Sequence, residues 1–198
     1  MRIIGLTGGI ACGKSNISQA LSKLGAVIID GDLLSRELTA PGGMALPQIR
    51  RVFGDEVFLP DGTLHRRALG ALIFGHDQAR ERLDGIMQPL LWQLIQQRIE
   101  EAREGGAALC VLDMPLLYEA GLDKLCERVW CAWIPRETQL QRLMARDGFT
   151  LEEAEARLRS QMPAQEKAAR ADVVIDTSGS IEYTTSMIPD LYAAELAR

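Results

Sequence analysis

The sequence predicts an α/β protein in which three layers are built around a five-stranded, mainly parallel β-sheet. Five short apolar runs alternate with segments in which apolar residues recur at helical spacing. The first run ends in glycines, and three of the others end directly in aspartate. Such alternation implies right-handed strand–helix–strand crossovers, which place ligands at the carboxyl ends of the strands. The five runs are residues 2–7, 26–29, 108–112, 129–134 and 173–175.

The first run leads into a glycine-rich loop that fits the pattern G-x-x-x-x-G-K-S. Gly8 and Gly13 lack a Cβ at the tight points of this loop, so that backbone N–H groups can converge on phosphate. Lys14 is expected to reach the β- and γ-phosphates of ATP, and the Ser15 hydroxyl to bind Mg²⁺ at the start of a helix. The pattern predicts a P-loop NTPase fold. The nucleotide-binding residues of this segment are Gly8, Gly9, Ile10, Ala11, Cys12, Gly13, Lys14, Ser15 and Asn16.

Aspartates follow the second and third runs at the sheet edge where the P-loop is expected. In Asp30-Gly31-Asp32, a spacing of two directs both carboxylates to one side if the segment is extended, and one of them is a candidate to accept a proton from a hydroxyl. The alternative is that one of the pair caps a helix beginning near Leu33. Asp113 is expected to hold a Mg²⁺-bound water, the alternative being a strand-end cap.

Two long intervals interrupt the strand–helix alternation. Residues 31–107 are too many for one crossover helix, so we expect an added helical region that binds the second substrate. Residues 136–170 are strongly charged and helical in pattern, which favours a lid. The nucleotide-binding core then comprises residues 1–30, 108–135 and 171–198 of a single unit, 1–198.

Composition and charge exclude some function classes. The formal net charge of −5 gives no general attraction to nucleic acid, and no apolar run is long enough to span a membrane, so a cytoplasmic protein is expected. Guanine-specific switches need an Asn-Lys-x-Asp reader, but the only asparagine is Asn16, in the first helix. The four cysteines form no CxxC pair, and Cys12 is interpreted as an accidentally reactive thiol within the loop that the chemistry does not need. A small kinase is favoured, and a homo-oligomer is left open.

Five separate groups of residues resemble the dephospho-CoA kinase family, almost from end to end of the chain. The second and third groups are much more specific than the P-loop. The groups are Gly5-Leu6-Thr7-Gly8-Gly9-Ile10 with the lysine loop; Ile29-Asp30-Gly31-Asp32 with Arg36-Glu37-Leu38 and Pro41-Gly42; Asp113-Met114-Pro115-Leu116-Leu117-Tyr118-Glu119; Arg142-Leu143-Met144-Ala145-Arg146-Asp147; and Ala171-Asp172-Val173-Val174-Ile175-Asp176 with Gly179-Ser180.

The resemblance implies transfer of the ATP γ-phosphoryl group to the 3′-hydroxyl of the ribose of dephospho-CoA, giving CoA and ADP. Asp32 matches the family's proposed base, and Arg142 and Arg146 match lid positions that neutralise charge on the transferring group. The alternative for both arginines is solvated helix charge. The substrate-binding positions it implies are Thr7, Asp30, Asp32, Arg36 and Leu116, and Thr177 and Gly179 are implied on the adenine side.

The chain departs from the family pattern at three positions. Gln88 stands where many members have histidine, and Thr177 where asparagine is common, which leaves adenine-side recognition open. Gly31 replaces the usual alanine. Two other functions would use the same loop: a P-loop kinase for another nucleotide or small metabolite, and a nucleotide-gated binding protein that hydrolyses ATP slowly.

Overall fold

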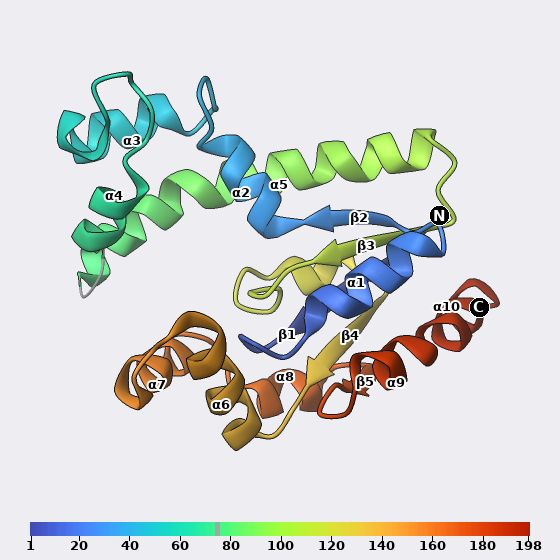
Figure 1. Cartoon of the computed structure of the whole chain (residues 1–198). Helices are drawn as coiled ribbons and strands as arrows, with labels where there is room; N and C mark the ends of the chain where they lie inside the picture. Colours follow the sequence, from blue (N-terminus) through green and yellow to red (C-terminus); the bar gives the residue numbers. More distant parts are fainter. Residues whose placement is uncertain (74–75) are drawn as a thin grey trace. The chain divides into compact units, whose positions relative to one another are not determined.

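The computed structural model describes residues 1–73 and 76–198, and the chain divides into two compact units (Figure 1). The first unit comprises Met1–Asp30 and Glu101–Arg198, and the second comprises Gly31–Glu100. Within the described residues, no helix is both long enough and apolar enough to cross a membrane.

The first unit contains the five predicted strands in one parallel sheet. The register pairs β1 with β3 and β4, β2 with β3, and β4 with β5, giving the order β2-β3-β1-β4-β5. The prediction of a parallel α/β sheet is therefore confirmed. The strands are β1 (Arg2–Gly8), β2 (Val27–Asp30), β3 (Leu109–Asp113), β4 (Arg128–Trp133) and β5 (Val173–Asp176).

Helices cover both faces of this sheet. Ile4 and Leu6 of β1 lie in a buried cluster with Ile17 of α1 and Ile188 of α10. Gly5 and Thr7 point the other way, because side chains alternate along a strand: Gly5 lies against Leu117, and α8 contacts β1 and β4. Besides the short η2 (Leu122–Leu125), the helices described in this unit are α1 (Lys14–Lys23), α6 (Arg136–Asp147), α7 (Leu151–Arg159), α8 (Ala164–Arg170), α9 (Ile181–Ser186) and α10 (Ile188–Leu196).

The second unit is helical in its described part. Its buried apolar residues include Leu38, Ile49 and Val57. Arg66 Nη2 donates to Thr39 Oγ1 at 2.8 Å, and Arg98 forms an ion pair with Glu37 at 2.9 Å. The elements are α2 (Gly31–Leu38), α3 (Leu46–Phe53), η1 (Asp55–Val57), α4 (Arg66–Ile73) and α5 (Asp77–Glu104), whose last turn belongs to the first unit.

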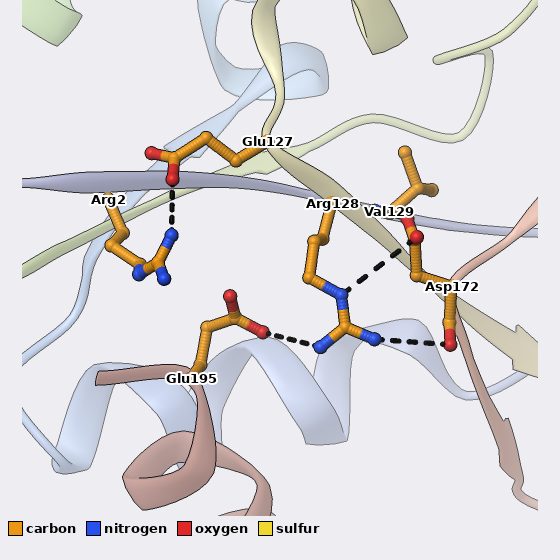
Figure 2. A network of polar contacts seen from close by, with 6 residues as sticks. All are labelled: Arg2, Glu127, Arg128, Val129, Asp172 and Glu195. Atoms are coloured by element: carbon orange, nitrogen blue, oxygen red, sulfur yellow. Dashed lines mark hydrogen bonds and ion pairs between the residues drawn. The ribbon is translucent and has the colours of Figure 1, made fainter. Parts of the chain in front are cut away.

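A polar network closes the amino ends of β1, β4 and β5, at the edge of the sheet away from the P-loop (Figure 2). Arg128 bonds the buried carboxylate of Glu195 on α10 at 3.1 Å and the Asp172 carbonyl at 3.3 Å. Asp172 Oδ2 accepts the Val129 N–H at 2.8 Å, and Arg2 pairs with Glu127. Since Glu195 is 1% exposed, loss of Arg128 would leave its carboxylate buried without that partner. The network thus stabilises the fold far from the P-loop.

Candidate active site

The P-loop joins the carboxyl end of β1 to α1. The Cys12 N–H donates to the Gly9 carbonyl at 3.1 Å, which closes the turn. Gly13 lies in the left-handed region with φ 72°, where glycine is favoured. Ala11 also has a positive φ, 61°, which is uncommon for a residue with a Cβ. The predicted glycine loop is therefore a strained turn before a helix amino terminus, as a phosphate cradle requires.

Side chains from distant parts of the chain hold this loop from outside. Gln139 of α6 donates from Nε2 to the Ile10 carbonyl at 2.7 Å, and Thr177 donates from Oγ1 to the Cys12 carbonyl at 2.7 Å. A Cβ on Gly9 would lie 2.4 Å from Gln139 Nε2, so the loop needs glycine there for a packing reason. No sequence pattern points to Gln139, because a glutamine inside a charged helix matches no motif.

Lys14 and Asp113 form an ion pair beneath the loop. The Lys14 ammonium donates to Asp113 Oδ1, and the side chains are 17% and 4% exposed. Burial raises the pKa of the Asp113 carboxyl, while the Lys14 ammonium and the Ser18 hydroxyl act in the opposite direction. Asp30 lies opposite Asp113 in the β2–β3 register, and its charge also raises that pKa. Three residues predicted for the site thus meet at the carboxyl ends of adjacent strands.

The segment from Asp30 to Asp32 lacks the extended geometry that would direct both carboxylates to one side. Gly31 and Asp32 are the first two residues of α2, so the spacing of two does not carry the alternation of a strand past Asp30. Asp32 is exposed in the first turn, where the helix dipole favours a carboxylate. Arg36 lies one turn further along the same helix and is also exposed, and Gln88 is an exposed residue of α5.

The two candidate arginines of α6 have different partners. Arg142 Nη2 donates to the carbonyls of Thr177 at 2.9 Å and Ser178 at 3.4 Å, so it fastens α6 to the loop after β5. Arg146 forms a bidentate pair with Asp147, with both N–O distances 2.9 Å. Of the two, Arg142 is bonded to the backbone after β5, whereas the Arg146 side chain is largely exposed.

The helices α6 and α7 share a small apolar core that reaches the P-loop. Leu143, Ala154 and Leu158 are buried together, and Ile10 and Ala11 pack against them. A pocket of about 560 Å³ opens beside Gly9, lined by residues from the end of β4 and from all three helices between β4 and β5.

One lysine of the strongly charged interval 136–170 is buried, although no sequence motif marks it. Lys167 of α8 is 0% exposed and forms an ion pair with Glu119 at 2.9 Å. It also donates to the Pro115 carbonyl, which accepts the Thr7 hydroxyl at 3.2 Å. Thr7 is fully buried, whereas Leu116, beside Pro115, is 45% exposed. Lys167 and Glu119 therefore fix the segment that follows Asp113.

Cys12 is buried beneath the loop, which overturns its interpretation as a reactive thiol. Burial raises the pKa of the Cys12 thiol to about 11, that of Cys110 to about 11, and those of Cys126 and Cys131 to about 12. The thiolate is the nucleophile, and at pH 8 a thiol of pKa 11 is ionised in only about one molecule in a thousand.

We therefore expect iodoacetamide to label the native protein slowly at pH 8 and the urea-unfolded protein rapidly, as measured by mass spectrometry. The pKa values of the cysteine thiols are higher in the folded state than the ordinary 9.0. The stability that the protonated thiols contribute is therefore complete below about pH 9 and is lost as the pH rises through about 11. Rapid labelling of native Cys12 at pH 8 would contradict this.

Comparison with known proteins gives one consistent result. The family model described as dephospho-CoA kinase matches residues 2–183. A dephospho-CoA kinase of Geobacter sulfurreducens is 47% identical over 193 residues, covering 98% of each chain. The solved dephospho-CoA kinase of Campylobacter jejuni is 26% identical, with a TM-score of 0.74 over 98% of this chain and 96% of that one. A shikimate kinase of Acinetobacter baumannii, 19% identical with a TM-score of 0.55 over 100% and 94% of the two chains, shares the fold.

Proposed function

The chain belongs to the dephospho-CoA kinase family, and we propose that it transfers the γ-phosphoryl group of ATP to the ribose 3′-hydroxyl of dephospho-CoA, producing CoA and ADP. The observation that carries this conclusion is the match over almost the whole chain, which includes the strand-end aspartates as well as the P-loop. The fold supports a P-loop kinase, and the family match supports dephospho-CoA as the acceptor.

Lys14 has two anionic partners in this proposal. In the structure its ammonium donates to Asp113. Binding of ATP presents the β- and γ-phosphates to the amino terminus of α1, and the ammonium exchanges Asp113 for phosphate oxygens. This positions a positive charge where negative charge develops during transfer.

Mg²⁺ is the ion that this arrangement fits. Ser15 is exposed at the second position of α1, and the buried Asp113 carboxylate at the end of β3 offers oxygen ligands. The described residues contain no group of three His, Cys, Asp or Glu side chains that could hold a metal. Mg²⁺ commonly takes one or two protein ligands and completes its shell with phosphates and water. We infer that Ser15 would hold the ion directly and Asp113 through water, and that the bound ion would supply charge neutralisation at the phosphates.

Asp32 is proposed as the base that receives the 3′-hydroxyl proton. Its support is the resemblance of residues 29–32 to the family, whose model matches residues 2–183, and its exposed place in the first turn of α2. A carboxylate within hydrogen-bond reach of the hydroxyl orients the nucleophile and accepts its proton. Asp30, two residues earlier, is the supporting carboxylate.

The remaining site residues divide between charge stabilisation and binding. Arg142 and Arg146 are proposed to neutralise charge on the transferring phosphoryl group. A guanidinium has five N–H donors, so the bonds from Arg142 to the loop after β5 leave others for a phosphate. The proposed dephospho-CoA contacts are Thr7, Asp30, Asp32, Arg36 and Leu116, and Thr177 and Gly179 belong to the nucleotide side. A cytoplasmic location stays a prediction.

The function is tested with purified protein, ATP, Mg²⁺ and dephospho-CoA. We expect ADP and CoA to form in equal amounts, with the new phosphate on the 3′-oxygen by ³¹P nuclear magnetic resonance. Shikimate and nucleoside monophosphates serve as competing acceptors. A strong preference for either would assign a different kinase, and ATP hydrolysis unaffected by any acceptor would indicate a nucleotide-gated binding protein.

A further inference from the structure

Two carbonyl groups of the P-loop are fixed by side chains that lie far away in the sequence. The Ile10 carbonyl accepts from Gln139, 129 residues away, and the Cys12 carbonyl accepts from Thr177, 165 residues away. Gln139 is 3% exposed and Thr177 is 5% exposed, so neither hydrogen bond is exchanged freely with water.

Fixing a carbonyl also fixes the N–H of the next residue. All peptide bonds of the described chain are trans, so C=O and the following N–H point in opposite directions in one plane. The Ile10 carbonyl points to Gln139 of α6, so the Ala11 N–H points away from Gln139. The Cys12 carbonyl points to Thr177, so the Gly13 N–H points away from Thr177. These are N–H groups of the kind that bind phosphate oxygens in a P-loop.

The loop conformation needs such external support. Ala11 lies in the left-handed region, where the Cβ of an L-residue comes too close to the following carbonyl oxygen. A strained conformation persists only where the surrounding structure holds it. The hydrogen bond from Gln139 to the Ile10 carbonyl, which precedes Ala11, holds Ala11 in this conformation.

Both supports are themselves held in place by α6 and β4. The Thr177 N–H donates to the Trp133 carbonyl at 3.0 Å, and its carbonyl accepts from Arg142 at 2.9 Å. Gln139 and Arg142 are three residues apart and therefore share one face of α6. One helix thus reaches the P-loop directly through Gln139 and indirectly through Thr177.

We propose that Gln139 and Thr177 are positioning residues for ATP, which set the Ile10–Ala11 and Cys12–Gly13 peptide planes of the P-loop for binding the phosphates. The proposal rests on the P-loop as the ATP site of the proposed function. It assigns the Thr177 hydroxyl to the phosphate loop, where the family pattern had suggested an adenine-side contact.

The test separates phosphate recognition from adenine recognition. Thr177→Val removes the hydroxyl at constant shape, Thr177→Ser keeps it, and Gln139→Met removes the amide donor at similar length. Affinities for ATP, inorganic triphosphate and adenosine are measured by calorimetry without dephospho-CoA. Arg128→Met is the control, because it destabilises the fold through Glu195 at the far edge of the sheet.

We expect Thr177→Val and Gln139→Met each to weaken binding of ATP and triphosphate about 10- to 100-fold, the value of the charge-assisted hydrogen bond between a loop N–H and a phosphate oxygen that is lost when the peptide plane turns. Adenosine affinity should stay within about twofold, Thr177→Ser should restore ATP binding, and Arg128→Met should bind all three ligands normally despite a lower melting temperature.

Three results would overturn the proposal: equal losses for adenosine and ATP, unchanged ATP affinity in both variants, or the same pattern in Arg128→Met. Failure of the wild-type protein to bind ATP would instead remove the proposed function, so the two are distinguishable.

Discussion

Asp32→Asn is expected to bind ATP with wild-type affinity while its kcat falls by about 10²- to 10⁴-fold, the usual contribution of a general base. The amide keeps the shape of the carboxylate but cannot accept the hydroxyl proton. The P-loop and the Lys14–Asp113 pair are untouched, so nucleotide binding is preserved. The measurement is steady-state ADP release with dephospho-CoA, together with calorimetric titration of ATP.

Glu37→Gln is the matched control for this variant. Glu37 lies on the same helix and pairs with Arg98, but it is not proposed to contact a substrate. Its kcat should remain within about twofold of wild type, because a half-exposed ion pair contributes at most about 1 kcal/mol to stability. Near-normal turnover of Asp32→Asn would move the role of base to Asp30, which is then changed to asparagine in the same assay.

Lys14→Met is expected to lower kcat/KM by about 10³-fold, since removal of one preorganised donor to developing charge costs about that much. The structure adds an effect on stability. Without the ammonium, the Asp113 carboxylate is left buried, and breaking a buried pair in this way costs about 3 kcal/mol. Urea unfolding of the ligand-free variant measures this loss, which should be partial, leaving a folded protein.

The pH dependence of that loss identifies Asp113 as its source. Lys14 counteracts the effect of burial on the pKa of Asp113, so its removal raises that pKa further. The neutral carboxyl is tolerated at low pH, and stability is lost as the pH rises through the folded-state pKa. The deficit against wild type should therefore be small in acid and largest at neutral pH.

A double variant, Lys14→Met with Asp113→Asn, separates stability from catalysis. It should recover most of the lost stability and lose the pH dependence, because neither side chain of the pair then carries a charge, yet its turnover should stay low. Equal stability of the single and double variants at neutral pH would show that the ion pair does not contribute to the ligand-free fold.

The strands and the P-loop could be predicted because each is encoded in a short stretch of sequence. Each strand is a short apolar run whose boundaries are set by neighbouring residues, and the five observed strands begin and end within one residue or so of the predicted ones. The P-loop is equally local, because its glycines and Lys14 act within one turn of chain. A helical region within residues 31–107 was predicted from the length of that interval, and the helices α2, α3, α4 and α5 lie in it.

The sequence by itself determined the phosphate-binding loop, the strand-end carboxylates and, through its resemblance, the family. Tertiary structure alone decided the order of the strands, the Lys14–Asp113 pair and the partners of Ile10 and Cys12. Those contacts join residues about 100 or more positions apart, and a hydrogen bond depends on distances of a few tenths of an ångström. Spacing along the chain does not encode such distances; the packing of α6 and β5 around the loop sets them.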